Sequence, residues 1–369
     1  MKTPGSATKP GHLYHEPAFK SDLPHQRGNA DRWRILELHE DWRGKVVVDY
    51  GCNAGYFTFM TATHGAKLSH GFDIDREAIR FARQQAIDNS IRNVTFNDKD
   101  LANYYYHEEL NPDVVLLLSV IPWIERTEPN PWTILRELMT AKTAYIELMY
   151  EGDGRAGMAG IKSDLEAKRW LQGHYKTAYP VGWTWPEHNG GIRRCLWRCS
   201  QEETPGRKEK ADHVGSQAFV YLHERIVVKA GRSESRYQAP REVVALDRMK
   251  IDMVAPQPVF INPGENMIGM TRLQGATLAS WGKIPPGGED WFMAQAERIC
   301  LAMEKRNVKH NDVRPENLWV GADGRLYLLD FGWATVDGVG EVPATINPEY
   351  RAANDRGSFE KIYERLCQK

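Results

Sequence analysis

A regular alternation of short apolar runs with helical patterns, between Val46 and Ile146, constrains the fold of this chain more than any other feature. We predict strands at residues 46–48, 68–72, 94–96, 114–118 and 144–148, and helices at 56–63, 76–89 and 131–141. Strands that alternate with helices over about a hundred residues are typical of a doubly wound, mostly parallel sheet. The first half of the chain is therefore predicted to be an α/β domain.

A second domain is expected because the chain has 369 residues, whereas one domain usually holds about 100 to 200. The charged run from Ser200 to Asp212 contains a proline and a glycine and has no apolar periodicity, which is typical of a linker. Beyond it we predict strands at 218–221 and 226–228 and helices at 242–249 and 290–305. The predicted organisation is a mobile N-terminal arm at 1–30, an α/β domain at 31–205 and a small α+β domain at 206–369, with a lid over an active site as the alternative for the arm.

The charge balance narrows the classes of partner. The 48 basic and 49 acidic residues give a net charge of -1, so no global positive field favours nucleic acid or an anionic membrane. No apolar run reaches the roughly 18 to 20 residues that cross a bilayer, and the N-terminus lacks an apolar signal core. We expect a cytoplasmic enzyme.

The five cysteines have no framework-like spacing, which suits a reducing compartment. Cys195 and Cys199, with His188 nearby, form at most a fragment of a zinc site, because a fourth ligand is missing and the segment has the pattern of a strand. A metal at this place is the less favoured interpretation.

A glycine-bearing turn follows the first predicted strand. Gly51 and Gly55 allow the backbone to turn sharply and to approach a ligand closely, and the helix that follows offers free amide hydrogens. Asp73 ends the next strand, 22 positions after Gly51, where a carboxylate can bind a ribose diol. Asp100 follows the third strand and could contact an adenine amino group, although Asp98 competes for that role.

These residues resemble the class I methyltransferases, which have a Rossmann-like fold and use S-adenosylmethionine. The pattern D-x-G-C-x-x-G matches their first motif, and Asp49 would face the methionine part of the cofactor. The plain alternative is a strand-turn-helix junction without a ligand. Ser119 lies where the family places catalytic or acceptor-positioning residues, yet no general base stands between Ser119 and Trp123. The resemblance implies a cofactor site formed by Asp49, Gly51, Cys52, Asn53, Gly55, Asp73, Asp100 and Ser119.

The most specific pattern of the chain is H-N-D-V-R-P-E-N at residues 310–317, followed by L-D-F-G at 329–332. It resembles protein-kinase-like enzymes, in which one Asp accepts a hydroxyl proton while an Asn and a second Asp hold Mg²⁺ for ATP. Asp312 matches the base, and Asn317 and Asp330 match the metal ligands, five and 18 positions later. Amide and carboxylate oxygens suit this hard cation.

Upstream residues complete the resemblance to a kinase. Lys229 ends a strand as the kinase lysine does, and Glu242 begins a helix where its ion-pair partner belongs. Residues 267–273 match the strand and hinge that hold adenine, so Thr271 and Leu273 are predicted to bind the nucleotide through their backbone. The loop at 215–218 lies where the nucleotide-covering loop belongs but lacks the second and third glycines, so tight cradling of the phosphates is in doubt.

A methyltransferase followed directly by a small kinase resembles the bifunctional O-antigen chain terminators of Gram-negative bacteria. In that family the kinase phosphorylates the end of a polymannose chain and the methyltransferase caps the phosphate. Arg314-Pro315 in place of the usual kinase lysine is shared with this group. Pro122-Trp123 replaces its paired histidines, and only 37 residues follow Gly332, so we expect an abbreviated helical lobe and carry over neither membrane recruitment nor chain-length measurement.

Three hypotheses follow. The first is a dual enzyme that phosphorylates a glycan or another polyhydroxylated molecule with ATP and Mg²⁺ and then methylates the new phosphate, which the family resemblance would make a step in lipopolysaccharide biosynthesis. Arg193 or Arg194 could hold that phosphate, and the alternative is that both are surface charges. The second keeps both activities but on unrelated acceptors, and the third makes the kinase-like part a non-catalytic module. The expected partner is a glycan or small-molecule substrate and not nucleic acid, and peripheral association with a glycan-synthesis complex stays open.

Overall fold

The computed structural model describes residues 29–100, 110–121, 124, 138–139, 141–150, 161–184, 194–233, 237–282, 288–340, 342, 349–350, 352 and 354–367. Several predictions lie outside these residues: nearly all of the arm, most of the helix at 131–141, Pro122-Trp123 and His188.

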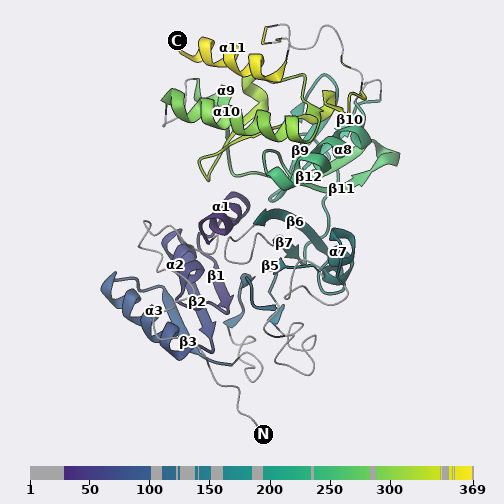
Figure 1. Ribbon diagram of the computed structural model, residues 1–369. Helices are drawn as coiled ribbons and strands as arrows, with labels where there is room; N and C mark the ends of the chain where they lie inside the picture. The colour runs from purple at the N-terminus through teal and green to yellow at the C-terminus, as the bar shows by residue number, and fades with distance from the viewer. Residues whose placement is uncertain are drawn as a thin grey trace. The chain divides into compact units, whose positions relative to one another are not determined.

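The described residues form two compact units (Figure 1). The first unit holds residues up to Trp33, 41–178 and 184–203, and the second holds 34–40, 179–183 and those from 204 onward. Two short stretches from the predicted first domain thus belong with the second unit. The predicted boundary between residues 205 and 206 stays a prediction, and the irregular chain from 201 to 212 agrees with a linker there.

A seven-stranded sheet organises the first unit, in the order β3-β2-β1-β4-β5-β7-β6. Strands β1 to β5 pair in parallel, and β7 runs antiparallel to β5. This confirms the predicted doubly wound, mostly parallel sheet. The strands are β1 Val46–Tyr50, β2 Leu68–Asp73, β3 Val94–Asp98, β4 Val114–Leu117, β5 Thr143–Leu148, β6 Thr177–Thr184 and β7 Arg194–Ser200, and the helices are α1 Asn29–His39, α2 Tyr56–Thr63, α3 Arg76–Asp88 and α7 Asp164–Gln172. Most of α1 and most of β6 lie in the two stretches, 34–40 and 179–183, that belong with the second unit.

Apolar strands explain why this sheet has a parallel centre. All residues of β4 and β5 are buried, as expected of strands covered on both faces by helices and connections. Helix α2 packs against β1 and β2, and α3 packs against β2 and β3 (Figure 1). Asp75 caps α3 by accepting the amides of Glu77 and Ala78, which fixes where that helix begins.

The second unit begins with a five-stranded sheet in the order β11-β12-β10-β9-β8, in which every pairing is antiparallel. Two small antiparallel sheets follow, β13-β15-β16 and β14-β17. The strands are β8 His213–Val214, β9 Ala218–Leu222, β10 Ile226–Gly231, β11 Pro258–Asn262, β12 Met267–Thr271, β13 Gly275–Thr277, β14 Val308–Lys309, β15 Leu318–Gly321, β16 Leu326–Leu328 and β17 Thr335–Val336. The α-helices are α8 Ala239–Met249, α9 Leu278–Trp281, α10 Gly288–Lys305 and α11 Asp355–Cys367, and 3₁₀ turns include Pro315–Asn317 and Phe331–Trp333.

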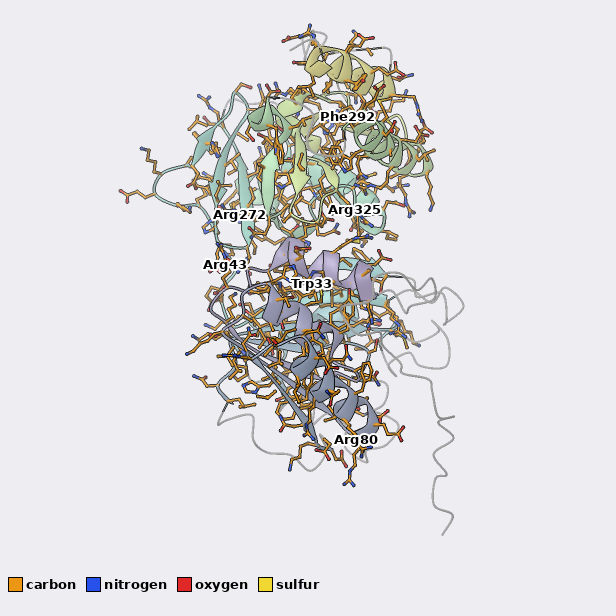
Figure 2. The ribbon with its side chains drawn as sticks, turned by 90° about the vertical axis from the view of Figure 1, so that its left-hand side faces the viewer. Trp33, Arg43, Arg80, Arg272, Phe292 and Arg325 are labelled. Carbon is orange, nitrogen blue, oxygen red and sulfur yellow. The ribbon has the colours of Figure 1, made fainter. Side chains whose placement is uncertain are left out.

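Helices α10 and α11 form the helical part of the second unit. Phe292 of α10 is fully buried (labelled in Figure 2). Its ring centroid lies 6.2 Å from that of Tyr363, with the rings stacked, and 6.3 Å from that of Phe359, and both partners are on α11. One core joins these helices to α8 and to the sheet residues Ile268 and Leu328. A small α+β unit with a short helical part is what the sequence predicts. None of the helices in the described chain is long and apolar enough to cross a membrane.

Two candidate active sites

In the first unit the turn after β1 is tied to the end of β2. The amides of Gly51 and Cys52 both donate to Phe72 O, at 2.8 and 3.0 Å, and the amide of Asn53 donates to Asp73 Oδ2 at 2.7 Å. Gly55 has a φ of 83°, and a Cβ there would lie 2.5 Å from a ring carbon of Phe96. Only glycine fits this position.

Asp73 is placed by backbone donors on both of its oxygens, since Oδ1 accepts the amide of Asp75 at 2.8 Å. Each carboxylate oxygen can accept a second hydrogen bond, so a ribose diol still fits. Asp98, the rival of Asp100, forms ion pairs with Arg83 at 3.2 Å and Arg76 at 3.6 Å. These pairs favour Asp100 for the predicted adenine contact, which stays a prediction.

Asp49 lies buried beside this turn and accepts a hydrogen bond from Thr58 Oγ1 at 2.8 Å. Burial raises the pKa of its carboxyl to about 7, against the opposing effect of the Thr58 hydroxyl. Burial also raises the pKa of the Cys52 thiol, which is thereby kept in its neutral form. Asn53 Oδ1 is buried and has no hydrogen-bond partner among the described residues. The turn therefore offers an unsatisfied acceptor and a carboxyl that a nearby cation would ionise.

A second group in the first unit, the arginine cluster, consists of Arg32, Ser119, Glu147 and Arg194. Arg194 Nη1 donates to Ser119 Oγ and lies 3.2 Å from Glu147 Oε2, and Ser119 Oγ lies 2.5 Å from the same carboxylate oxygen. Arg32 Nη1 adds contacts of 3.1 Å to Ser119 Oγ and 3.5 Å to Glu147 Oε2. Two guanidinium groups thus share one carboxylate, and the buried Asp49 is a further acidic neighbour of Arg32.

The cluster lies at the carboxyl edge of the parallel sheet, where ligands of this fold class bind. Ser119 follows β4 with a φ of 64°, a strained conformation for a non-glycine residue that is often found at functional sites. Burial alone would raise the pKa of Glu147, but Arg32 and Arg194 hold it below its usual range. The carboxylate therefore stays ionised and orients both arginines.

In the second unit a lysine links two carboxylates. Lys229 of β10 lies 2.9 Å from Glu242 Oε2 of α8 and forms an ion pair with Asp330. Burial opposes its charged form, yet Asp330 and Glu242 together raise the pKa of Lys229. The ring of Tyr237 covers the ammonium at 4.6 Å. Burial alone would raise the pKa of Asp330, but Lys229 lowers it, so the carboxylate is ready to bind a cation.

The loop at 310–317 holds Asp312 and Asn317 together. Asn317 Nδ2 donates to Asp312 O at 2.9 Å and to Asp312 Oδ2 at 3.1 Å, which leaves the carbonyl oxygen of this amide for a cation. Asp312 Oδ1 is buried without a hydrogen-bond partner in the described part of the chain, and burial raises the pKa of the carboxyl. Arg314 Nε lies 3.6 Å from Asp312 Oδ2.

Sequence reasoning missed a support for this loop. Asp355, the first residue of α11, accepts the amides of His310 at 2.8 Å and Asn311 at 2.9 Å. The His310 ring contacts Leu329 O at 2.8 Å and packs edge-on against Phe331. Asp355 lies 38 positions beyond the end of the motif at Asn317, in a segment with no signature of its own, so only the fold reveals its role.

The hinge after β12 has alternating amide partners. The amide of Arg272 donates to Arg225 O at 2.9 Å and that of Gln274 to Leu38 O at 3.1 Å. The amide of Leu273, between them, makes no hydrogen bond to any described residue. Thr271 Oγ1 accepts the amide of Gln257, and the amide of Thr271 donates to Gln257 O at 2.9 Å. A nucleotide contact by Thr271 would therefore use its carbonyl oxygen.

The loop over the expected nucleotide is a tight hairpin. The amide of Gly215 donates to Ala218 O at 2.9 Å, which leaves Ser216-Gln217 as a two-residue turn. Arg232 donates through its amide to Gln217 O at 3.1 Å and through Nη1 to Gly215 O at 3.3 Å. So short a turn offers few amides to phosphates, in line with the doubt raised by its missing glycines.

Comparison with known proteins identifies the first unit. Residues 42–168 match the family model of a methyltransferase domain. The chain contains a methyltransferase domain. A ribosomal protein L11 methyltransferase of Psychrobacter cryohalolentis is 29% identical over 123 residues, which are 30% of this chain and 40% of that protein.

Two further similar proteins carry the word kinase in their names. An Aurora kinase of Encephalitozoon cuniculi is 38% identical over 53 residues, 14% of this chain and 20% of the kinase. A solved structure of the bifunctional kinase-methyltransferase WbdD covers 88% of this chain and 80% of its own, with 19% identity and a TM-score of 0.44. The chain spans less than half the length of the curated relatives named here.

S-adenosylmethionine fits the methyltransferase domain. The buried acceptor on Asn53, the Asp49 carboxyl and the remaining lone pairs of Asp73 line one sheet edge. When bound, this cofactor supplies a methyl group on a positively charged sulfur. All of the predicted cofactor residues of the first unit lie along the strand ends, and Arg32, Glu147 and Arg194 are additions that no motif indicated.

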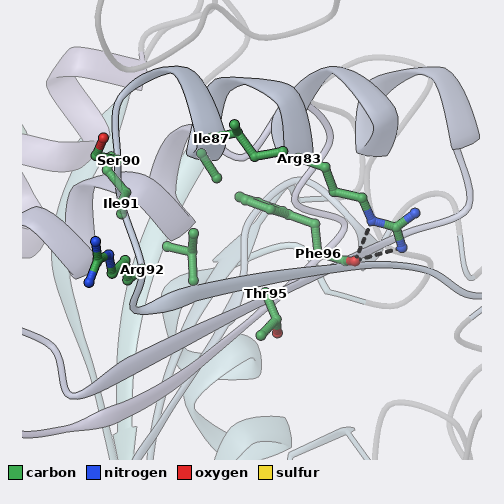
Figure 3. A pocket seen from close by; sticks show the side chains of 9 residues that line it. Arg83, Ile87, Ser90, Ile91, Arg92, Thr95 and Phe96 are labelled. Carbon is green, nitrogen blue, oxygen red and sulfur yellow. Dashed lines mark hydrogen bonds between the residues drawn. The ribbon is translucent and has the colours of Figure 1, made fainter.

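A pocket of about 560 Å³ lies elsewhere in the methyltransferase domain, between α3 and β3 (Figure 3). Ile87, Ile91 and Val94 line it, and Arg83 closes one end by donating to Phe96 O at 2.8 and 3.0 Å. None of the predicted site residues lines this pocket. Within the described residues no group of three His, Cys, Asp or Glu side chains could hold a metal, so the zinc interpretation at Cys195 and Cys199 gains no support.

Proposed function

We propose that this chain phosphorylates a hydroxyl of a glycan or related polyhydroxylated acceptor with ATP and then methylates the new phosphate. The observation that carries the kinase half is the set Lys229, Glu242, Asp330, Asp312 and Asn317, which the second unit brings together. This constellation positions phosphates, metal and acceptor for phosphoryl transfer.

Each of these residues would have a separate role in phosphoryl transfer. Asp312 would accept the proton of the attacking hydroxyl through its unpartnered oxygen. Lys229, held by Glu242, would bind the nucleotide phosphates. Asn317 and Asp330 would hold Mg²⁺, which when bound neutralises charge on the phosphates.

The arginine cluster supports a phosphate as the methyl acceptor. Two buried arginines meet at the sheet edge, and Arg194 Nε is buried without a hydrogen-bond partner among the described residues. A phosphate monoester at neutral pH carries between one and two negative charges. Its oxygen forms the new bond to the methyl carbon as the carbon-sulfur bond breaks, and no proton has to be removed. This explains why no general base is required near Ser119.

We expect methyl transfer to an oligomannoside to require ATP. Asp312→Ala should abolish the transfer, because no phosphate is formed, and a chemically phosphorylated acceptor should restore it. The measurement is the incorporation of labelled methyl groups, followed by mass spectrometry of the glycan. Equal labelling without ATP would show that the two units act on different groups.

Arg194→Gln should lower kcat/KM for the phosphorylated acceptor by about 10- to 100-fold, because a hydrogen bond to a charged group contributes about 1.5 to 3 kcal/mol. Cofactor affinity, measured by calorimetry, should stay within about twofold. Arg198→Gln is the matched control: it is a buried arginine on the same strand, but it contacts Thr143 at the opposite end of β5. Equal losses in the two variants would argue against an acceptor role for Arg194.

The short turn at Ser216-Gln217 favours one alternative, a kinase-like unit that binds without catalysis. Titration of the natural chain with ATP, with and without Mg²⁺, distinguishes an active kinase from a unit that only binds the nucleotide. Binding strengthened by Mg²⁺ together with phosphate transfer supports the enzyme, and binding without any turnover supports the module.

A further inference from the structure

The predicted nucleotide hinge, residues 271–274, is held by contacts from residues 34–40, which lie far from it in the sequence. Leu38 O accepts the amide of Gln274 at 3.1 Å. The Leu38 side chain is 1% exposed and packs in one apolar cluster with Leu273 and Tyr327. Both the backbone and the side chain of Leu38 thus contact the hinge.

A buried ion pair strengthens this support. Glu40 Oε1 lies 2.6 Å from Arg225 Nη2, and the two side chains are 0% and 6% exposed. The exposed Glu224 lies 3.2 Å from the same nitrogen, so Glu40 is the buried carboxylate of the two. Arg225 O in turn accepts the amide of Arg272 at 2.9 Å. Removal of one partner from a buried pair leaves an uncompensated charge, so such a pair holds its backbone segments firmly.

Together these contacts fix the amides of Arg272 and Gln274 and leave that of Leu273 without a partner among the described residues. An adenine ring nitrogen can accept a hydrogen bond from such an amide, and a donor that is already held in place before binding loses less freedom when the base binds. The support therefore decides where that donor points.

We propose that Leu38 and Glu40 are positioning residues of the nucleotide site, which orient the hinge for an adenine base. The proposal rests on the proposed kinase function and adds residues that lie more than 160 positions before the nearest predicted nucleotide ligand, Lys229. Their loss should weaken recognition of the base and spare recognition of the phosphates.

The test compares two probes, Mg·ATP and Mg·tripolyphosphate, by calorimetry with the full chain. In Glu40→Gln we expect the affinity for ATP to fall by about tenfold or more, while that for tripolyphosphate changes by less than about twofold. The double variant Glu40→Arg with Arg225→Glu restores opposite charges and should recover most of the ATP affinity. Asp252→Asn is the control. It breaks another ion pair of the second unit, between Asp252 and Arg306, and neither residue belongs to the hinge.

The outcomes are distinct. Equal losses for ATP and tripolyphosphate, or a swapped variant as weak as Glu40→Gln, would overturn the positioning role and leave the kinase assignment intact. A natural chain that binds tripolyphosphate but not ATP would overturn the kinase assignment and this proposal with it. Binding of S-adenosylmethionine by each variant verifies that the first unit is folded.

Discussion

Asp312→Asn should lower the rate of phosphoryl transfer by about 10²- to 10⁴-fold, the usual cost of losing a positioned base. The asparagine can still accept the hydrogen bond from Asn317 Nδ2 that Asp312 Oδ2 accepts at 3.1 Å. Its amide cannot take the proton of an attacking hydroxyl, so binding of Mg·ATP should persist. Single-turnover phosphorylation and nucleotide calorimetry measure the two effects separately.

Asp330→Ala should change binding rather than base catalysis. The variant removes a metal ligand and one partner of Lys229, so the affinity for ATP should lose most of its dependence on Mg²⁺. Asp337→Asn is a suitable control, because Asp337 forms an exposed ion pair with Arg248 and belongs to no predicted site. Full kinase activity in both Asp312→Asn and Asp330→Ala would contradict the assigned roles.

The second large effect is the pH dependence of stability that the buried carboxyl of Asp49 should cause. Burial raises the pKa of this carboxyl to about 7, against 3.8 in an unfolded chain. Between these values the folded protein keeps a proton that the unfolded chain has lost, so the free energy of unfolding falls as pH rises. At about 1.4 kcal/mol per pH unit, the cost reaches the order of 4 kcal/mol near pH 7. Asp49→Asn should therefore stabilise the cofactor-free protein at pH 8 and change little at pH 4, as urea unfolding can measure.

The same carboxyl should govern cofactor binding in the opposite direction. The ammonium group of S-adenosylmethionine would pair with the ionised form if Asp49 has its predicted role, so affinity should fall by about tenfold for each pH unit below 7 in the natural chain. In Asp49→Asn it should be weak at every pH. Thr58→Val removes the hydrogen bond that opposes the shift and should move the affinity profile to higher pH. A flat profile between pH 5 and 8 in the natural chain would refute this role for Asp49.

The sequence predicts the parts of each site that lie in one short segment. Gly51 to Gly55 and His310 to Asn317 are contiguous, and local hydrogen bonds fix their geometry wherever they occur. The predicted strands and the helix at 56–63 followed from apolar periodicity, which is strongest in a buried parallel sheet.

Apart from Arg194, which was one of two arginines expected to hold the phosphate, the arginine cluster could not be predicted in this way. Arg32, Glu147 and Arg194 are separated by 115 and 47 positions. They meet because β7 runs antiparallel beside β5, which places Arg194 at the end of the sheet where Glu147 lies. Strand order and direction set such contacts, and a single sequence does not encode them in any local pattern. Asp355 was missed for the same reason.

The composition of the second unit has a consequence for gene fragments. A fragment that begins at residue 204 encodes the predicted kinase motifs but omits residues 34–40 and 179–183, which belong to the same compact unit. It would lack Leu38 O for Gln274 and the countercharge of Glu40 for Arg225. The two units therefore cannot be separated by a single cut in the gene. A recombination event between residues 203 and 204 would transfer the second unit without Leu38 and Glu40, whose contacts hold Gln274 and Arg225.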